Sequence, residues 1–153
     1  VYPPVCFVNF SKSPSMTLPS GLPESVQDEE PISRFLTQSS HYNTTAVKPP
    51  AFIPNPKDGR LSVARHSGHP LEASERMAKV DFNLPKAVGL ALLSAHEFRE
   101  EGLDFEADDS PPRHADVVGW PWRKEDPEYA KSERKLIAAA LAQKAQRLLF
   151  MST

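Results

Sequence analysis

Proline is the feature that most limits what this chain can fold into. The 153 residues contain 16 prolines, of which six lie within residues 1–31 and four within residues 49–56. Proline lacks a backbone N–H and pushes the preceding residue towards extended geometry, so helix is disfavoured in both segments. These segments are therefore expected to be extended or looped, and residues 49–56 fit an edge strand at best.

Residues 1–31 are expected to form an extended, mobile arm ahead of a single domain at residues 32–153. The stretch from residue 11 to residue 31 is rich in Ser, Pro and acidic residues, so it cannot bury enough apolar surface to offset its ordering entropy. Met16 is either an alternative start or an ordinary residue of this arm. The short apolar stretch near the beginning has no basic residues before it, which indicates a cytoplasmic protein without a secretory signal.

Composition excludes several classes of protein. The formal net charge of -2 and the pI near 6.2 argue against a general polyanion binder, so nucleic acid is not an expected partner. No apolar run approaches the ~18 residues needed to span a bilayer, so no membrane contact is expected. The single Cys6 excludes an intramolecular disulfide and a Cys-rich metal site, and neither a metal nor a cofactor is expected.

Apolar periodicity predicts a single α+β domain with a short, mostly antiparallel sheet. The Asp58-Gly59 turn precedes an alternating run, which indicates a strand, and residues 46–52 are expected to pair with it. Residues 32–37 and 87–98 fit either a strand or a helix. The other short elements expected are strands at 61–65, 103–108 and 117–118 and a helix at 70–80.

The clearest helical signal is a long amphipathic helix at the C-terminus. Asp126 is a good N-cap, Pro127 suits the first helical position and Glu128 complements the helix dipole. Apolar residues from Ala130 to Leu149 recur at three- to four-residue steps. This pattern predicts roughly six turns at ~3.6 residues per turn.

A first candidate cluster consists of Arg34, His41 and Tyr42. Arginine can bind a phosphate or carboxylate with two hydrogen bonds, and histidine exchanges a proton near neutral pH. The alternative interpretation is a surface histidine on a polar loop beside an arginine whose stem packs on the domain.

A second cluster joins the proline-rich loop to the strand that follows it. Residues 33–80 carry seven basic and three acidic residues, a net charge of +4, which suits an anionic partner. Residues 97–109 carry seven acidic residues and one arginine, so the basic surface could instead face this acidic segment. The candidate binding residues of this cluster are Lys48, Phe52, Arg60 and Arg65.

A third cluster contains Arg113 and His114 and leads to the run Trp120-Pro121-Trp122. Two tryptophans flanking a proline make a stiff aromatic corner that can stack on a ligand or a peptide. The alternative is that this aromatic corner is a hydrophobic plug that covers the end of the C-terminal helix.

The motifs in these clusters resemble those of a group of small bacterial proteins of unassigned function. They are R-F-x5-H-Y at 34–42, K-P-x-A-F-x-P at 48–54, L-S-V-x-R at 61–65 and R-H-A-x-V-x-G-W-P at 113–121. The resemblance covers residues 32–145 and implies a small, stand-alone bacterial cytoplasmic protein. It implies no reaction, ligand or catalytic role.

Two functions from different classes fit these observations, and neither is tied to a complete catalytic signature. The first is an adaptor that docks a protein partner through the proline-rich basic loop and the Trp-Pro-Trp corner, since stiff surfaces lose little entropy on binding. The alternative is a small enzyme or nucleotide-binding protein that acts on a phosphate-bearing substrate. In that case Arg34, Lys48 and Arg65 would hold the anion, and the candidate general acid or base is His41 or His114.

Overall fold

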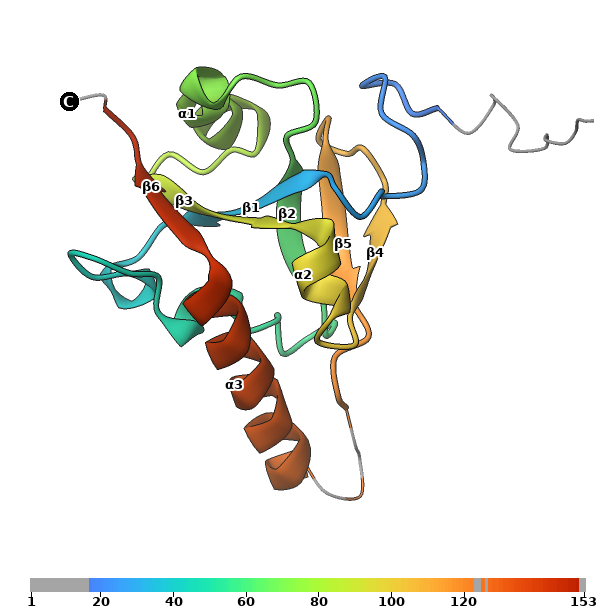
Figure 1. Ribbon diagram of the computed structural model, residues 1–153, viewed down its shortest axis with the longest axis vertical. Coiled ribbons are helices and arrows are strands. Elements are labelled where there is room, and N and C mark those ends of the chain that lie inside the picture. The colour runs from blue at the N-terminus through green and yellow to red at the C-terminus, as the bar shows by residue number, and fades with distance from the viewer. Residues whose placement is uncertain (1–16, 123–124, 126, 152–153) are drawn as a thin grey trace, which may run out of the picture.

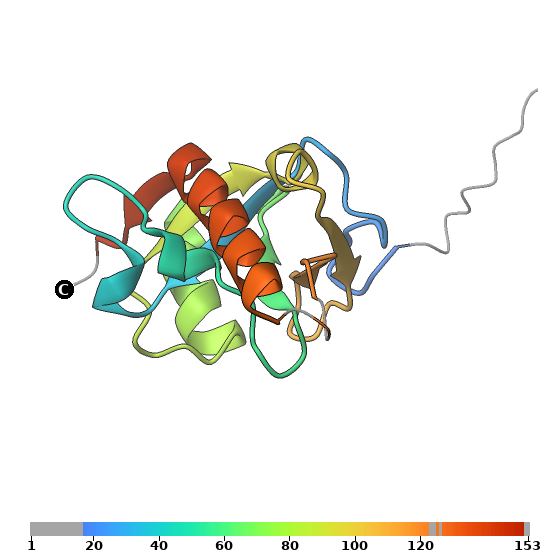
Figure 2. The ribbon, with the colours of Figure 1, turned by 90° about the horizontal axis from the view of Figure 1, so that it is seen from below.

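The structure is a computed structural model that describes residues 17–122, 125 and 127–151. The described residues form a 6-stranded antiparallel sheet with helical segments on both faces, which confirms the predicted α+β domain (Figures 1 and 2). The strand order is β4-β5-β2-β1-β3-β6. The strands are β1 Pro31–Leu36, β2 Leu61–Arg65, β3 Gly89–Ser94, β4 Asp104–Ala107, β5 His114–Val118 and β6 Gln146–Leu149.

The helical segments divide between the two faces of the sheet. The long helix α3 (Pro127–Lys144) crosses one face, where Leu141 packs in the same core cluster as Leu61 and Val63 of β2 (Figure 2). Ala64 faces the other way and packs with Met77 in a second cluster. The remaining helical segments are η3 (Ser39–His41), η4 (Pro49–Phe52), η5 (Leu71–Ala73), α1 (Ser74–Arg76), the π-helical η6 (Met77–Asp81) and α2 (Ala95–Arg99).

The structure corrects the strand pairing that the sequence predicts for β2. Strand β2 occupies the expected residues, but its partners are β1 and β5. Residues 46–52 do not pair with it, because Pro49 and Pro50 begin the 3₁₀ turn η4. The ambiguous residues 87–98 contain both a strand, β3, and the start of α2, where Ser94 and Glu97 form a capping box.

The C-terminal helix is shorter than its apolar pattern predicts. Helix α3 ends at Lys144, and Leu148 and Leu149 belong to the edge strand β6, which pairs with β3. Gly89 permits this pairing, since a Cβ atom there would overlap the carbonyl oxygen of Leu148. The expected N-cap Asp126 lies outside the described residues.

The packed structure begins before residue 32. Leu22 and Val26 are buried, and Glu30 is buried with them. The part of the expected arm from residue 17 onward therefore contributes to the folded domain, whereas residues 1–16, with Cys6 and Met16, lie outside the described residues. Within the described part of the chain, the helices are too short or too polar to cross a membrane.

Candidate functional site

A hollow opens where β1 and β2 separate. The two strands pair only through Ile32 with Arg65 and Ser33 with Ala64. Beyond these pairs, Arg34 fills the gap: its Nε donates to the carbonyl oxygen of Ala51 at 2.9 Å and its Nη1 to that of Ser62 at 3.0 Å. We call the adjoining hollow of about 660 Å³ the Arg34 pocket. Its charged and polar lining includes Arg34, Gln38, Ser40, His41, Asn55, Lys57, Asp58, Arg60, Ser62 and Asp116.

Arg34 is a cation of this pocket that has no ion-pair partner among the described residues. Among the described residues it has no carboxylate partner, and its Nη2 has no protein hydrogen-bond partner. Burial lowers its pKa to about 10, so the guanidinium stays charged at neutral pH. Arg60 differs, because it binds Glu106 at 2.7 Å and Asp116 at 3.2 Å. Arg60, a member of the second predicted cluster, therefore faces the acidic segment at residues 97–109, as the alternative interpretation of that cluster expects.

The structure brings His41 to the same pocket as Arg34, as the first predicted cluster requires. His41 ends the turn η3, is buried, and accepts a hydrogen bond from the backbone N–H of Thr37 at 3.3 Å. Burial lowers its pKa, and the charge of Arg34 lowers it further. His41 is therefore neutral at neutral pH. Tyr42, the third member, packs half-buried against the main core.

Two other aromatic residues predicted to bind a ligand or partner, Phe52 and Trp120, lie in the core. Phe52 is fully buried, with its ring edge-to-face against Phe98 at a centroid distance of 6.2 Å. Trp120 is buried, and its Nε1 donates to the carbonyl oxygen of Val117 at 3.1 Å. Phe52 offers no surface to a partner. Trp120 contributes only a small exposed part to a surface hollow, and the plug interpretation fits its buried position.

The predicted basic residues Arg65 and Arg113 hold the structure together. Arg65 is fully buried and binds Glu30 with two hydrogen bonds of 2.9 and 2.7 Å. Arg113 donates from Nη1 to the carbonyl oxygens of Arg65 and Ser67 at 3.2 and 2.7 Å. Lys48 is half-buried at the start of η4 and does not line the Arg34 pocket.

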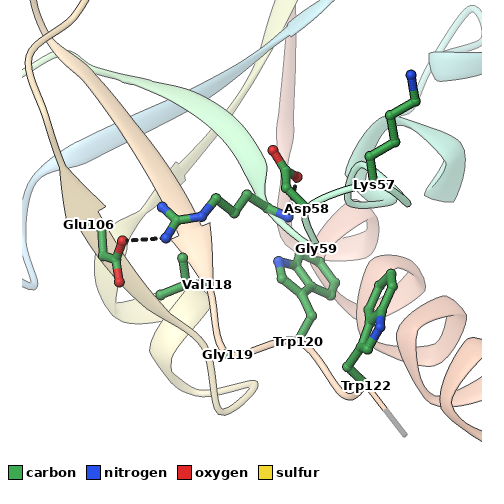
Figure 3. A pocket seen from close by; sticks show the side chains of 9 residues that line it. Lys57, Asp58, Gly59, Glu106, Val118, Gly119, Trp120 and Trp122 are labelled. Carbon is green, nitrogen blue, oxygen red and sulfur yellow. Dashed lines mark hydrogen bonds and ion pairs between the residues drawn. The ribbon is translucent and has the colours of Figure 1, made fainter. Parts of the chain in front are cut away.

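A second, smaller hollow of about 340 Å³ adjoins the Arg34 pocket, because Lys57, Asp58 and Arg60 line both. We call it the Trp122 pocket. Figure 3 shows Trp120 and Trp122 on one side and Glu106, which pairs with Arg60, on the other. Trp122 is 49% exposed, and the guanidinium carbon of Arg134 lies 4.3 Å from the centre of its ring.

His114 does not reach His41; it belongs to a hydrogen-bonded chain on the other side of β2. Its Nε2 lies 2.8 Å from the Oγ of Ser62, and its Nδ1 lies 2.7 Å from an oxygen of Asp108. Sequence reasoning singled out His114 but missed Asp108, because their proximity depends on how β4 and β5 pair. The ligand atoms of Asp108, His114 and Asp116 also lie within 4.8 Å of one another, a spacing open to a metal ion. The hydrogen bonds made by both nitrogens of His114 already explain why these side chains lie close together.

No protein-family model matches this chain, and no curated protein or solved structure is significantly similar to it. The resemblance to small bacterial proteins stays a prediction.

Proposed function

We propose that this protein binds a small phosphate-bearing molecule in the Arg34 pocket. The observation that carries the proposal is the half-buried guanidinium of Arg34, held by two carbonyl oxygens, with one nitrogen left for a ligand. Lys57 adds a second cation without a carboxylate partner among the described residues. A hollow of about 660 Å³ suits a small molecule, and a guanidinium suits phosphate oxygens.

Replacing Arg34 is expected to weaken phosphate binding by roughly 10- to 100-fold, since a hydrogen bond to a charged group contributes about 1.5–3 kcal/mol. The probe is pyrophosphate, titrated by calorimetry into the wild type and the Arg34→Gln variant. Lys79→Gln is the matched control, because Lys79 pairs with Glu75 outside the pocket. Thermal unfolding of each variant establishes that the domain remains folded.

The proposal fails if pyrophosphate, inorganic phosphate and a nucleoside monophosphate all bind Arg34→Gln and the wild type equally. It fails also if none of them binds the wild type at millimolar concentration. The Arg34→Lys variant should lie between the two, because it keeps the charge but not the planar geometry.

His41 is expected to make anion binding stronger in acid. Burial, and then the charge of Arg34, lower the pKa of His41 in the free protein, so its neutral form predominates at pH 7. A bound anion favours the protonated form, so affinity should rise as the pH falls from 7 towards 5. The probe is sulfate, whose charge is constant over this range. His41→Gln should abolish the rise, and an unchanged rise in that variant would assign it to another group.

Docking of a protein partner is a second candidate function, favoured by the Trp122 pocket. Trp122 is the exposed member of the aromatic corner, and Lys57 of the proline-rich loop lies beside it. The two candidates separate at Arg34, because a partner docked on Trp122 has no need of that guanidinium. Loss of protein-partner binding in Trp122→Ala but not in Arg34→Gln would favour docking.

A further inference from the structure

Three neighbouring strands place Ser62, His114 and Asp108 in line on one face of the sheet. Ala64 of β2 pairs with His114 of β5, so Ser62 lies diagonally opposite His114. On the other side of β5, Asp108 directly follows β4, and the next residue, Asp109, donates its N–H to the carbonyl oxygen of His114. The result is a continuous Ser–His–Asp chain with heavy-atom distances of 2.8 and 2.7 Å.

The charge of Asp108 defines which atoms donate and which accept in the hydrogen bonds that link Ser62, His114 and Asp108. A carboxylate can only accept, so the Nδ1 of His114 carries the proton that Asp108 binds. The Nε2 is then left to accept the hydroxyl proton of Ser62. The carboxylate of Asp116 lies farther from Nε2, at 3.5 Å, and is held by Arg60.

Burial fixes the base while the hydroxyl stays accessible. The side chain of His114 is 11% exposed and lies against the ring of Phe82, with 5.8 Å between ring centres. Ser62, in contrast, is exposed and lines the Arg34 pocket. The backbone carbonyl of Ser62 accepts a hydrogen bond from Arg34, so residue 62 borders the proposed anion site.

We propose that Ser62 is a nucleophile, His114 its general base and Asp108 the residue that positions His114, and that the site hydrolyses a carboxylic ester bearing an anionic group. The substrate class rests on the proposed function, because Arg34 would hold the anionic group. A nucleophile, a base within hydrogen-bond reach and a third group that orients the base are the parts that acyl transfer requires.

The reaction balances without an oxidant or a cofactor. The Oγ of Ser62 attacks the ester carbonyl carbon, and its proton passes to Nε2 of His114. The bond to the alcohol oxygen then breaks, that oxygen takes the proton, and an acyl ester remains on Ser62. Water gives a proton to the same nitrogen and adds to the acyl carbon. Cleavage of the acyl–Oγ bond releases the acid and returns the proton to Ser62.

Labelling with an alkyl fluorophosphonate tests the nucleophile without the natural substrate. We expect one adduct at Ser62 by intact mass and peptide mapping, none in Ser62→Ala, and labelling slowed roughly 10²- to 10⁴-fold in His114→Gln. Ser40→Ala is the matched control, because Ser40 lines the same pocket but bonds to Gln38 rather than to a histidine. No adduct at Ser62, under conditions that saturate a known serine hydrolase, would overturn the proposal.

A second measurement keeps the test decisive if His114→Gln does not fold. Ser62→Cys and Ser40→Cys, each combined with Cys6→Ser, are alkylated with iodoacetamide between pH 5 and 9. A thiol beside His114 should react roughly tenfold faster at pH 6.5 than the thiol at position 40, because the histidine favours the thiolate. Asp108 and Asp116 also face this site, and their negative charges oppose thiolate formation, so the expected tenfold ratio is the net of these effects and that of His114. Equal rates at the two positions would refute a base at His114.

The anion site at Arg34 and the nucleophile Ser62 can be refuted independently of each other. A fluorophosphonate is neutral, so Arg34→Gln should still be labelled at Ser62 even where it no longer binds pyrophosphate. Loss of the adduct with pyrophosphate binding intact refutes the nucleophile alone. Wild-type pyrophosphate binding in Arg34→Gln, with the adduct intact, refutes the anion site alone.

Discussion

Replacing Arg65 by methionine is expected to destabilise the domain by about 3–5 kcal/mol. The guanidinium of Arg65 is fully buried and is bonded twice to Glu30, whose side chain is 4% exposed. Without Arg65, the buried Glu30 carboxylate loses its direct ion-pair partner, and it must either stay charged without that partner or take up a proton. Urea unfolding followed by circular dichroism measures the loss.

Two controls separate this effect from a general sensitivity to charge. The double variant Glu30→Leu/Arg65→Met should recover much of the stability, since replacing both members of a buried pair leaves no unpaired charge. Lys79→Gln breaks a partly exposed ion pair with Glu75 of 2.7 Å and should cost less than about 1 kcal/mol. An Arg65→Met variant no less stable than Lys79→Gln would contradict the burial of this pair.

Replacing Phe52 by alanine is expected to cost about 3–5 kcal/mol of unfolding free energy. Phe52 comes from the proline-rich turn η4, packs edge-to-face on Phe98 and belongs to the core that α3 covers. The deletion leaves a cavity that a turn stiffened by Pro49 and Pro50 cannot easily fill. Chemical unfolding again measures the change.

The neighbouring Ile53 provides the matched control for Phe52. Ile53 is 38% exposed, so Ile53→Ala should cost well under half as much. A Phe52→Ala variant as stable as the wild type would mean that Phe52 is a surface anchor after all.

Local sequence signals were sufficient for strands β2 and β4, for part of β5 and for the start of the C-terminal helix. The alternation at Leu61–Arg65 predicts β2, and the proline and acidic residues near 127 predict the beginning of α3. The end of α3 could not be read in the same way, because Leu148 and Leu149 continue a helical spacing. Their place in β6 is decided by pairing with β3 beside Gly89, a contact between distant residues.

The candidate site, like the fold, could be predicted only in part from local sequence. Arg34 and His41 are seven residues apart and line one pocket, whereas Tyr42, the third member of the predicted cluster, packs against the core. Arg65 and Phe52 are residue types that often bind ligands or partners. Burial of Arg65 against Glu30, and of Phe52 against Phe98, gives them structural roles instead. Composition alone does not distinguish a cation that faces a ligand from one that faces a buried carboxylate.

The most direct test of an anion site at Arg34 is a crystal of the full chain soaked in tungstate, a heavy analogue of phosphate. The anomalous signal of tungsten locates the ion without reference to any assay. We predict a peak within hydrogen-bond distance of the Arg34 guanidinium, in the hollow that His41 and Lys57 also line. Peaks on exposed lysines alone, with the Arg34 pocket empty, would contradict the proposed function.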